Sequence, residues 1–162
     1  EVVLQLNKGI QKRLSLAKGD NVRDGMDMAI CVFDKENEVG ELICSGAYNP
    51  IYIYDNNTMI ESMPARVSVG SIDGSTKNLV KNESYKLQKG STVYLSTDGY
   101  ADQIGGPKGK KYMRGKFKKC LEDMNKDKVG MYDQKLKLRK ELENWKGKLS
   151  QTDDILVIGF RL

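Results

Sequence analysis

Histidine is absent from this 162-residue sequence, and cysteine, proline and tryptophan are scarce, with 3, 3 and 1 residues. Without histidine, the chain offers neither the usual zinc ligands nor the base of a Ser-His or Cys-His nucleophile. Its cysteines, Cys31, Cys44 and Cys120, are odd in number and widely spaced, and the first two lie in apolar patterns typical of strands. We therefore predict buried thiols in a reducing compartment. Hard metal ions bound through oxygen remain compatible with this composition.

Long apolar runs are also missing. The longest, such as residues 155–158, fall far short of the roughly 20 residues that a membrane-spanning helix needs, and the N-terminus does not resemble a signal peptide. No Walker-type or dinucleotide-binding glycine pattern is present, which argues against a nucleotide-binding domain. With 39% hydrophobic residues, the chain is long enough for one globular domain spanning residues 1–162.

The net charge of +5 is concentrated in residues 108–119 and 135–148, where basic residues are not interleaved with a stripe of aromatic residues. This pattern favours a solvated helical face over a surface for an acidic or phosphorylated partner. Nucleic acid binding is not needed to explain it, and we predict none.

Hydrophobic periodicity predicts helices and strands along the whole chain. Residues 3–14 have helical spacing, followed by a turn at 18–21. Strands are predicted at 26–34, 40–47 and 51–54, with turns at 36–38 and 55–57, which together resemble an antiparallel meander.

The second half of the chain combines two more strands with a pair of helices. Residues 63–79 read as a surface loop, and strands at 84–87 and 92–96 are predicted to form a hairpin around Lys89-Gly90. A mobile loop at 105–109 precedes helices at about 112–124 and 136–145 and a last strand at 155–162. This order predicts an α+β fold in which helices cover an antiparallel sheet or sheet pair.

Two aspartates stand where apolar strands meet loops: Asp98, after the strand at 92–96, and Asp153, before the last strand. Taken alone, Asp98-Gly99 is also a common turn, and Asp153-Asp154 can simply accept hydrogen bonds from free backbone amides. If the last strand pairs beside the strand at 92–96, both carboxylates lie at one edge of the same sheet. Gly99 would also leave its peptide carbonyl free to face a ligand.

Two carboxylates this close repel each other unless a cation lies between them. Carboxylate and water ligands without histidine suit Mg²⁺ or Mn²⁺, and a pair of such ions can activate water for attack on phosphorus. Asp27 is a third candidate, because it opens the first strand on the face of Ala29 and Cys31. A buried or edge carboxylate bonded to loop amides is the more economical interpretation of Asp27.

Four ordered sequence blocks resemble bacterial phosphatases of the stage II sporulation protein E type, which belong to the metal-dependent protein phosphatases (PPM) related to protein phosphatase 2C. The resemblance covers the whole chain. The blocks are residues 24–31 (DGMDMAIC), 45–50 (SGAYNP), 95–103 (LSTDGYADQ) and 151–159 (QTDDILVIG).

The resemblance implies an antiparallel β-sandwich flanked by α-helices. It also implies two Mn²⁺ or Mg²⁺ ions in the complete domain, which activate water to hydrolyse phosphoserine or phosphothreonine without a phosphoenzyme. By motif, Asp98 and Asp153 correspond to catalytic metal ligands, and Asp154 to a neighbour that helps to orient the site.

The family's first metal motif, an Asp-Gly or Asp-x-x-Gly-His-Gly element near the domain start, is absent: the chain has no histidine, and nothing equivalent precedes Asp24. The opening helix resembles the segment after that motif, so we expect the motif and the first strands upstream of Glu1. The fragment would then be N-terminally truncated, hold part of the site and have little activity alone. Its unpaired sheet edge would favour a homodimer or strand exchange.

Relatives of this kind are commonly effector domains of larger sensor proteins, some of them membrane receptors. The resemblance therefore implies a cytoplasmic domain, joined to an upstream sensor, that acts on a phosphorylated regulatory protein such as an anti-sigma-factor antagonist. The alternative is a non-catalytic interaction or regulatory module of the same fold. Retention of Asp98 and Asp153 favours the enzyme.

Overall fold

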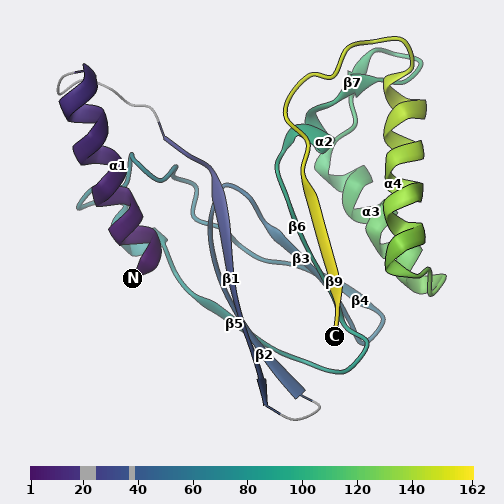
Figure 1. Cartoon of the computed structure of the whole chain (residues 1–162), viewed down its shortest axis with the longest axis horizontal. Coiled ribbons are helices and arrows are strands. Elements are labelled where there is room, and N and C mark those ends of the chain that lie inside the picture. The colour runs from purple at the N-terminus through teal and green to yellow at the C-terminus, as the bar shows by residue number, and fades with distance from the viewer. Residues whose placement is uncertain (19–24, 37–38) are drawn as a thin grey trace. The chain divides into compact units, whose positions relative to one another are not determined.

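The computed structural model of the chain describes residues 1–18, 25–36 and 39–162. Figure 1 shows the order of the helices and strands. The chain divides into two compact units: unit 1 comprises residues 1–50 and 62–86, and unit 2 comprises residues 51–61 and 87–162. The turns expected around residues 19–21 and 37–38 lie outside the described residues.

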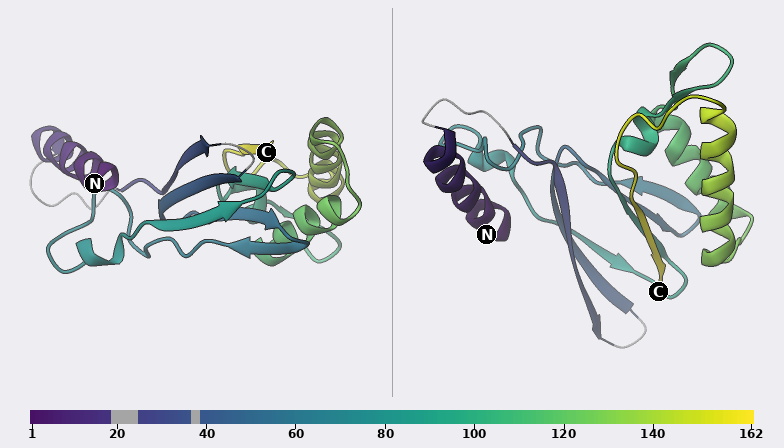
Figure 2. Two further views of the ribbon diagram at one scale, coloured as in Figure 1. Left: turned by 90° about the horizontal axis from the view of Figure 1, so that it is seen from below. Right: turned by 45° about the horizontal axis from the view of Figure 1, so that its top comes forward.

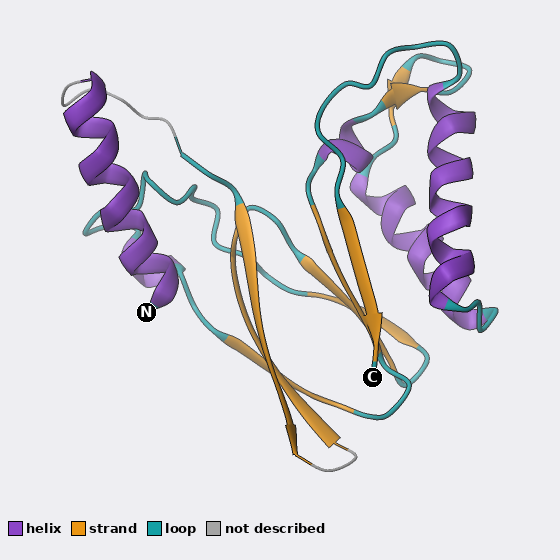
Figure 3. Ribbon diagram, viewed as in Figure 1, coloured by secondary structure: helices purple, strands orange, loops and turns teal. Residues whose placement is uncertain are grey.

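Unit 1 contains helix α1 (Val2–Lys18) and a three-stranded antiparallel sheet in the order β1-β2-β5. Its strands are β1 (Met28–Glu36), β2 (Val39–Ala47) and β5 (Glu83–Leu87), and the long β1–β2 hairpin is visible in Figure 3. The register places Cys31 directly opposite Cys44. The predicted helix and the first predicted hairpin are thus confirmed.

The segment between residues 62 and 80 is not the surface loop that its irregular sequence predicts. Ala65, Val67, Val69 and Ile72 are buried in a core cluster that also contains Val3 of α1. The segment contains the short 3₁₀ helix η1 (Lys77–Leu79), which lies near α1 in Figure 2, and isolated β-bridges at Ala65 and Val69. Long-range packing therefore orders a stretch with no local periodicity.

Asn7 joins α1 to this segment. Its side-chain oxygen accepts hydrogen bonds from the amides of Gly70 (2.7 Å) and Ile72 (3.0 Å), and its amide nitrogen donates to the carbonyl of Ile72 (2.9 Å). Because Asn7 is 4% exposed, these bonds satisfy backbone groups that water cannot reach.

Unit 2 is built on a four-stranded antiparallel sheet in the order β4-β3-β6-β9, in which β4 and β9 are the edge strands. Its strands are β3 (Ile51–Asp55), β4 (Thr58–Glu61), β6 (Thr92–Ser96) and β9 (Val157–Arg161). Asn56 and Asn57 both have positive φ, as a tight β3–β4 hairpin requires. The predicted hairpin of 84–87 with 92–96 is wrong, because β5 pairs with β2 and β6 with β3, in different sheets.

Three helices complete unit 2: α2 (Gly99–Asp102), α3 (Arg114–Lys126) and α4 (Met131–Lys146). The segment predicted as a mobile loop at 105–109 is instead the turn of a hairpin, in which β7 (Ile104–Gly105) pairs with β8 (Lys110–Lys111). The hairpin is docked on α4, because Gly106 donates its amide proton to the carbonyl of Trp145 (2.7 Å).

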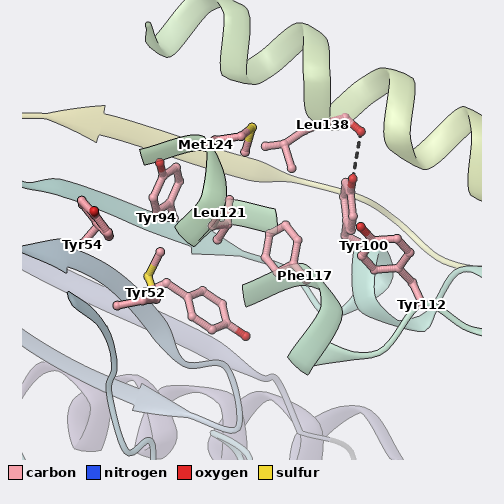
Figure 4. Packing of buried hydrophobic residues seen from close by; sticks show 10 residues of the cluster. Tyr52, Tyr54, Tyr94, Tyr100, Tyr112, Phe117, Leu121, Met124 and Leu138 are labelled. Atoms are coloured by element: carbon pink, nitrogen blue, oxygen red, sulfur yellow. Dashed lines mark hydrogen bonds between the residues drawn. The ribbon is translucent and has the colours of Figure 1, made fainter. Parts of the chain in front are cut away.

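The core of unit 2 is rich in aromatic residues. Tyr52 and Tyr94 are paired across β3 and β6, so their side chains lie on the same face of the sheet. Tyr52 and Tyr94 point from one face of the sheet toward Phe117 and Leu121 of α3 and Leu138 of α4 (Figure 4). The rings of Tyr52 and Phe117 meet edge to face, with centroids 5.7 Å apart. The helices therefore cover the face of the sheet that carries these tyrosines.

The basic segments of unit 2 form exposed surface, as predicted. Lys135, Lys137, Arg139 and Lys140 are exposed on α4, and ion pairs such as Lys111–Asp102 (2.7 Å) are also exposed and stabilise the fold only weakly. Among the described residues, none of the helices combines the length and apolar character needed to cross a membrane.

The three cysteines are free thiols, with Cys44 buried and Cys31 and Cys120 half-buried. Burial raises the pKa of Cys31 to about 11 and, with smaller contributions from nearby Glu83 and Cys31, that of Cys44 to about 12. Burial also raises the pKa of Cys120. These thiols are therefore protonated and weakly nucleophilic at neutral pH.

Candidate metal centre

The pairing of β6 with β9 brings the two aspartate motifs to one end of the sheet. The strands are antiparallel neighbours, and their last pair, Ser96 opposite Val157, stands next to both motifs. Asp98 follows β6, and Asp153-Asp154 precedes β9. The predicted neighbourhood of the last strand and the 92–96 strand is confirmed.

Thr97 ties the two chain segments together beyond the strands. Its backbone amide donates to the carbonyl of Leu156 (3.0 Å), and its hydroxyl donates to the carbonyl of Asp154 (2.8 Å). The same hydroxyl accepts a hydrogen bond from the amide of Leu156 (3.0 Å). The segment after Asp153 is thus fixed to the end of β6 by both backbone and side-chain bonds.

Gly99 shows how closely the two motifs approach. A Cβ atom at this position would lie 2.3 Å from the carbonyl oxygen and 2.9 Å from the carbonyl carbon of Asp154. Gly99 does not have a positive φ, so glycine is required here by close packing and not by the sharp turn that the sequence suggests. The backbone after Asp98 lies directly against the backbone after Asp153.

The Asp98 carboxylate is not used to cap the helix that it precedes. Asp98 occupies the N-cap position of α2, yet its side chain makes no capping hydrogen bond; only its backbone carbonyl is used, by the amide of Asp102 (2.9 Å). The side chain is half-buried at the sheet end. An acid that only terminated the strand would be expected to bind the free amides of α2.

Asp153 and Asp154 are both exposed. One carboxylate oxygen of Asp153 accepts a hydrogen bond from the amide of Asp154 (2.7 Å), as the simple turn interpretation expects. A carboxylate has two oxygens and about four acceptor positions, so this single bond leaves capacity for a cation.

Tyr100 anchors α2, the helix that follows Asp98, to the core of unit 2. It is 2% exposed, and its hydroxyl donates to the carbonyl of Leu138 (2.8 Å), the bond drawn in Figure 4. Its ring packs against Tyr112 and Phe117, with centroids 5.3 and 4.7 Å away. Because α2 is held this way against α3 and α4, the start of α2 at Asp98 is a rigid position.

Asp27, the third acidic candidate, belongs to unit 1. Its carboxylate accepts a hydrogen bond from the hydroxyl of Ser68 (2.6 Å). Within residues 1–18, 25–36 and 39–162, no group of three or more acidic, cysteine or histidine side chains is arranged to hold a metal ion. Unit 2 therefore supplies two neighbouring acidic motifs and not a complete ligand cage.

Three polar residues of the site were not singled out by sequence reasoning. Thr97, Gln103 and Thr152 connect the two motifs through hydrogen bonds. All three stand inside the 95–103 and 151–159 blocks, whose order in the sequence was the only signal for them. Periodicity cannot find such residues because their contacts are tertiary.

The family of the chain follows from a comparison over its whole length. The sequence model of the family described as stage II sporulation protein E (SpoIIE) matches residues 1–162. The chain belongs to the SpoIIE family. A search of curated proteins gives no match to this sequence.

Solved structures confirm the α+β fold of this SpoIIE family member. The SiaA-PP2C domain of Pseudomonas aeruginosa is similar with 22% identity and a TM-score of 0.72, over 99% of this chain and 69% of that chain. The phosphatase domain of the cell fate determinant SpoIIE from Bacillus subtilis has 12% identity and a TM-score of 0.59, over 98% and 72%. The chain therefore has the fold of PP2C-type (PPM) phosphatases, with antiparallel sheets and helices.

A third similar structure contains metal. The catalytic domain of the serine/threonine protein phosphatase PstP, in complex with 2 manganese ions, has 10% identity and a TM-score of 0.57, over 94% of this chain and 65% of that chain. The carboxylate oxygens of Asp98 and Asp153 are donors of the kind that hard divalent cations prefer.

Proposed function

We propose that the chain is part of a metal-dependent protein phosphatase domain that hydrolyses phosphoserine or phosphothreonine on a regulatory protein. The observation that supports this most directly is the close approach of the backbones at Gly99 and Asp154, where the motifs of Asp98 and Asp153 meet at one end of a sheet. Membership of the SpoIIE family supports the same function.

In this proposal, Asp98 and Asp153 are the catalytic residues that hold Mn²⁺ or Mg²⁺. The bound ions would supply an activated water and would neutralise the charge that develops on the transferred phosphate. Asp154 would orient the segment that carries Asp153, and the carbonyl oxygen of Gly99 would be a further candidate ligand. The two-metal centre would need further ligands besides these carboxylates.

The partner in this proposal is a phosphorylated regulatory protein, such as an anti-sigma-factor antagonist, and the domain would be the cytoplasmic output of a larger sensor protein. We also propose that β9, as an edge strand, favours a homodimer or strand exchange until another strand pairs with it. No role in nucleic acid binding is proposed.

A non-catalytic interaction module of the same fold is the second candidate. It is favoured by one observation, that the described residues contain no group of three or more metal-ligating side chains. The two candidates differ in whether a divalent cation binds at Asp98.

Mn²⁺ titration by calorimetry, followed by turnover of p-nitrophenyl phosphate, tests the proposal. The measurements use this chain and, where the parent gene encodes upstream residues, a form extended by about one hundred residues, a length within a typical domain. Asp98→Asn should abolish Mn²⁺ binding and turnover while changing the free energy of unfolding by less than about 0.5 kcal/mol, because no capping bond is lost.

Asp102→Asn is the matched control. Asp102 lies at the other end of α2, and its side chain forms a solvent-accessible ion pair with Lys111. Its replacement keeps the backbone hydrogen bond to Asp98 and should leave Mn²⁺ binding intact. If the extended protein neither binds Mn²⁺ nor hydrolyses the ester, the aspartates are structural and the interaction module is correct.

A further inference from the structure

The side chain of Gln103 forms hydrogen bonds with the segment that precedes Asp153. The residue is 0% exposed. Its side-chain oxygen accepts a hydrogen bond from the amide of Thr152 (3.1 Å), and its side-chain nitrogen donates to the carbonyl of Ser150 (3.0 Å). These two bonds hold the backbone on both sides of Gln151, immediately before Asp153.

The requirement at this position is specific for an amide. The nitrogen of Gln103 donates its second proton to the carbonyl of Ile104 (3.0 Å), so both donors and the acceptor are used. A glutamate would direct a carboxylate at two carbonyl oxygens, and an apolar residue would leave buried backbone groups unpaired. The side chain therefore matches its surroundings through hydrogen bonds and not through volume alone.

Gln103 is itself held firmly by its backbone. Its carbonyl oxygen accepts hydrogen bonds from the indole nitrogen of Trp145 (3.0 Å) and the amide of Tyr112 (2.9 Å). It follows α2, whose N-terminus carries Asp98, without an intervening residue. Residues 98–103 thus form one rigid stretch. It begins with the candidate ligand Asp98 and ends with Gln103, whose side-chain amide holds the segment before Asp153.

A third bond reinforces this connection. The hydroxyl of Thr152 accepts a hydrogen bond from the amide of Ile104 (3.1 Å). Each segment therefore donates a backbone amide to a side chain of the other: Thr152 to Gln103, and Ile104 to Thr152.

We infer that Gln103 is a positioning residue of the metal centre, which sets the place of Asp153 relative to Asp98 through the amides and carbonyls of residues 150–152. This inference rests on the proposed function. Residues that hold metal ligands indirectly typically change metal affinity by about 10–100-fold when they are replaced.

The test compares Gln103→Met and Gln103→Glu with the wild-type chain in Mn²⁺ calorimetry and in amide hydrogen exchange of residues 150–156. Gln103→Met removes the acceptor and both donors, and should weaken Mn²⁺ binding by about 10–100-fold and speed exchange in this segment. Gln103→Glu keeps an acceptor for the Thr152 amide and should have a smaller effect on exchange at that amide.

Gln134→Met is the matched control for the loss of a buried amide. Gln134 is 1% exposed, accepts a hydrogen bond from the Tyr94 hydroxyl (2.5 Å) and donates to the carbonyl of Val129 (3.0 Å), in the first turn of α4. It forms no hydrogen bond to residues 150–152, which Gln103 holds. Gln134→Met should destabilise the fold without changing Mn²⁺ affinity or the exchange of the amides in residues 150–152.

The outcomes separate the two levels of the argument. If Asp98→Asn weakens Mn²⁺ binding but Gln103→Met does not, the positioning role is overturned and the proposed function stands. If Gln103→Met and the control Gln134→Met weaken Mn²⁺ binding equally, Gln103 acts only through stability and the inference is again overturned. If the wild-type and extended proteins bind no Mn²⁺, the proposed function fails and the positioning role fails with it.

Discussion

Replacing Gly99 by alanine should damage the metal centre without removing any candidate ligand. The new Cβ would lie 2.3 Å from the carbonyl oxygen of Asp154, whereas a relaxed carbon–oxygen contact needs roughly 3.3 Å. The Asp154 backbone must therefore move away by about 1 Å. Because Asp153 precedes Asp154 directly, its carboxylate must move relative to Asp98.

Both stability and metal affinity should fall. Overpacking of this kind typically costs about 1–3 kcal/mol, which for a chain of this length lowers the melting temperature by about 2–4 °C per kcal/mol. Functional groups need to be held within about 0.5 Å of their working positions. We therefore expect Gly99→Ala to weaken Mn²⁺ binding by about tenfold or more, as for other disturbed supports of metal ligands.

Urea denaturation and Mn²⁺ calorimetry measure the two effects. Gly115→Ala in α3 provides the control, because nothing lies within 4 Å of its added Cβ, so metal affinity should not change and stability should rise slightly. Wild-type stability and affinity in Gly99→Ala would refute the close approach of the two motifs.

Three further predictions concern unit 1. Asn7→Ala should lower the free energy of unfolding in urea by about 2–5 kcal/mol, because it leaves two buried amides in residues 70–72 without acceptors; exposed Lys8→Ala should change it by less than about 0.5 kcal/mol. Gly9→Ala should raise it by about 0.5–1 kcal/mol, since Gly9 lies in α1 with open space around it; an unchanged midpoint would contradict this. Hydrogen bonds hold the pKa of Asp73 at about 2, below its usual 3.8, so its stabilising effect is complete above pH 3.8 and lost as the pH falls toward 2. Asp73→Asn should therefore flatten the pH dependence of stability between these values in urea titrations, and an unaltered slope would exclude this role.

The sequence predicted where the helices and strands lie better than it predicted which strands pair. Short apolar runs bounded by turn residues located β1, β3 and β6, and helical spacing located α1. The sequence Lys89-Gly90 is a common turn signal and predicted a hairpin. The turn itself exists, and Gly90 adopts a positive φ there. A turn signal reports that the chain reverses but not which strand it will pair with, and here the chain passes from one sheet to another.

Irregular segments were the least predictable. Glycines at 105–109 suggested mobility, yet the hairpin is fixed by the carbonyl of Trp145, which is distant in the sequence. Residues 63–79 lack a period because their burial depends on single contacts, such as those to Asn7, and not on a repeating face.

The candidate metal centre shows the same division. Asp98 and Asp153 were predicted as neighbours because each stands at the end of an apolar strand, and the β6–β9 register confirms that their motifs are adjacent. Their role as ligands stays a prediction. Thr97 and Gln103 had no local signal, because each acts through bonds to residues more than 40 positions away.

The β6–β9 pairing also sets the order in which the protein can mature. Thr92 pairs with Arg161 and Ser96 with Val157, so the two halves of the site meet only after a loop of about sixty residues closes, a slow and entropically costly step in folding. A chain in which β9 has not yet paired with β6 therefore contains both aspartates without their motifs being adjacent. Loss of residues 157–162 alone should have the same effect as loss of the aspartates themselves.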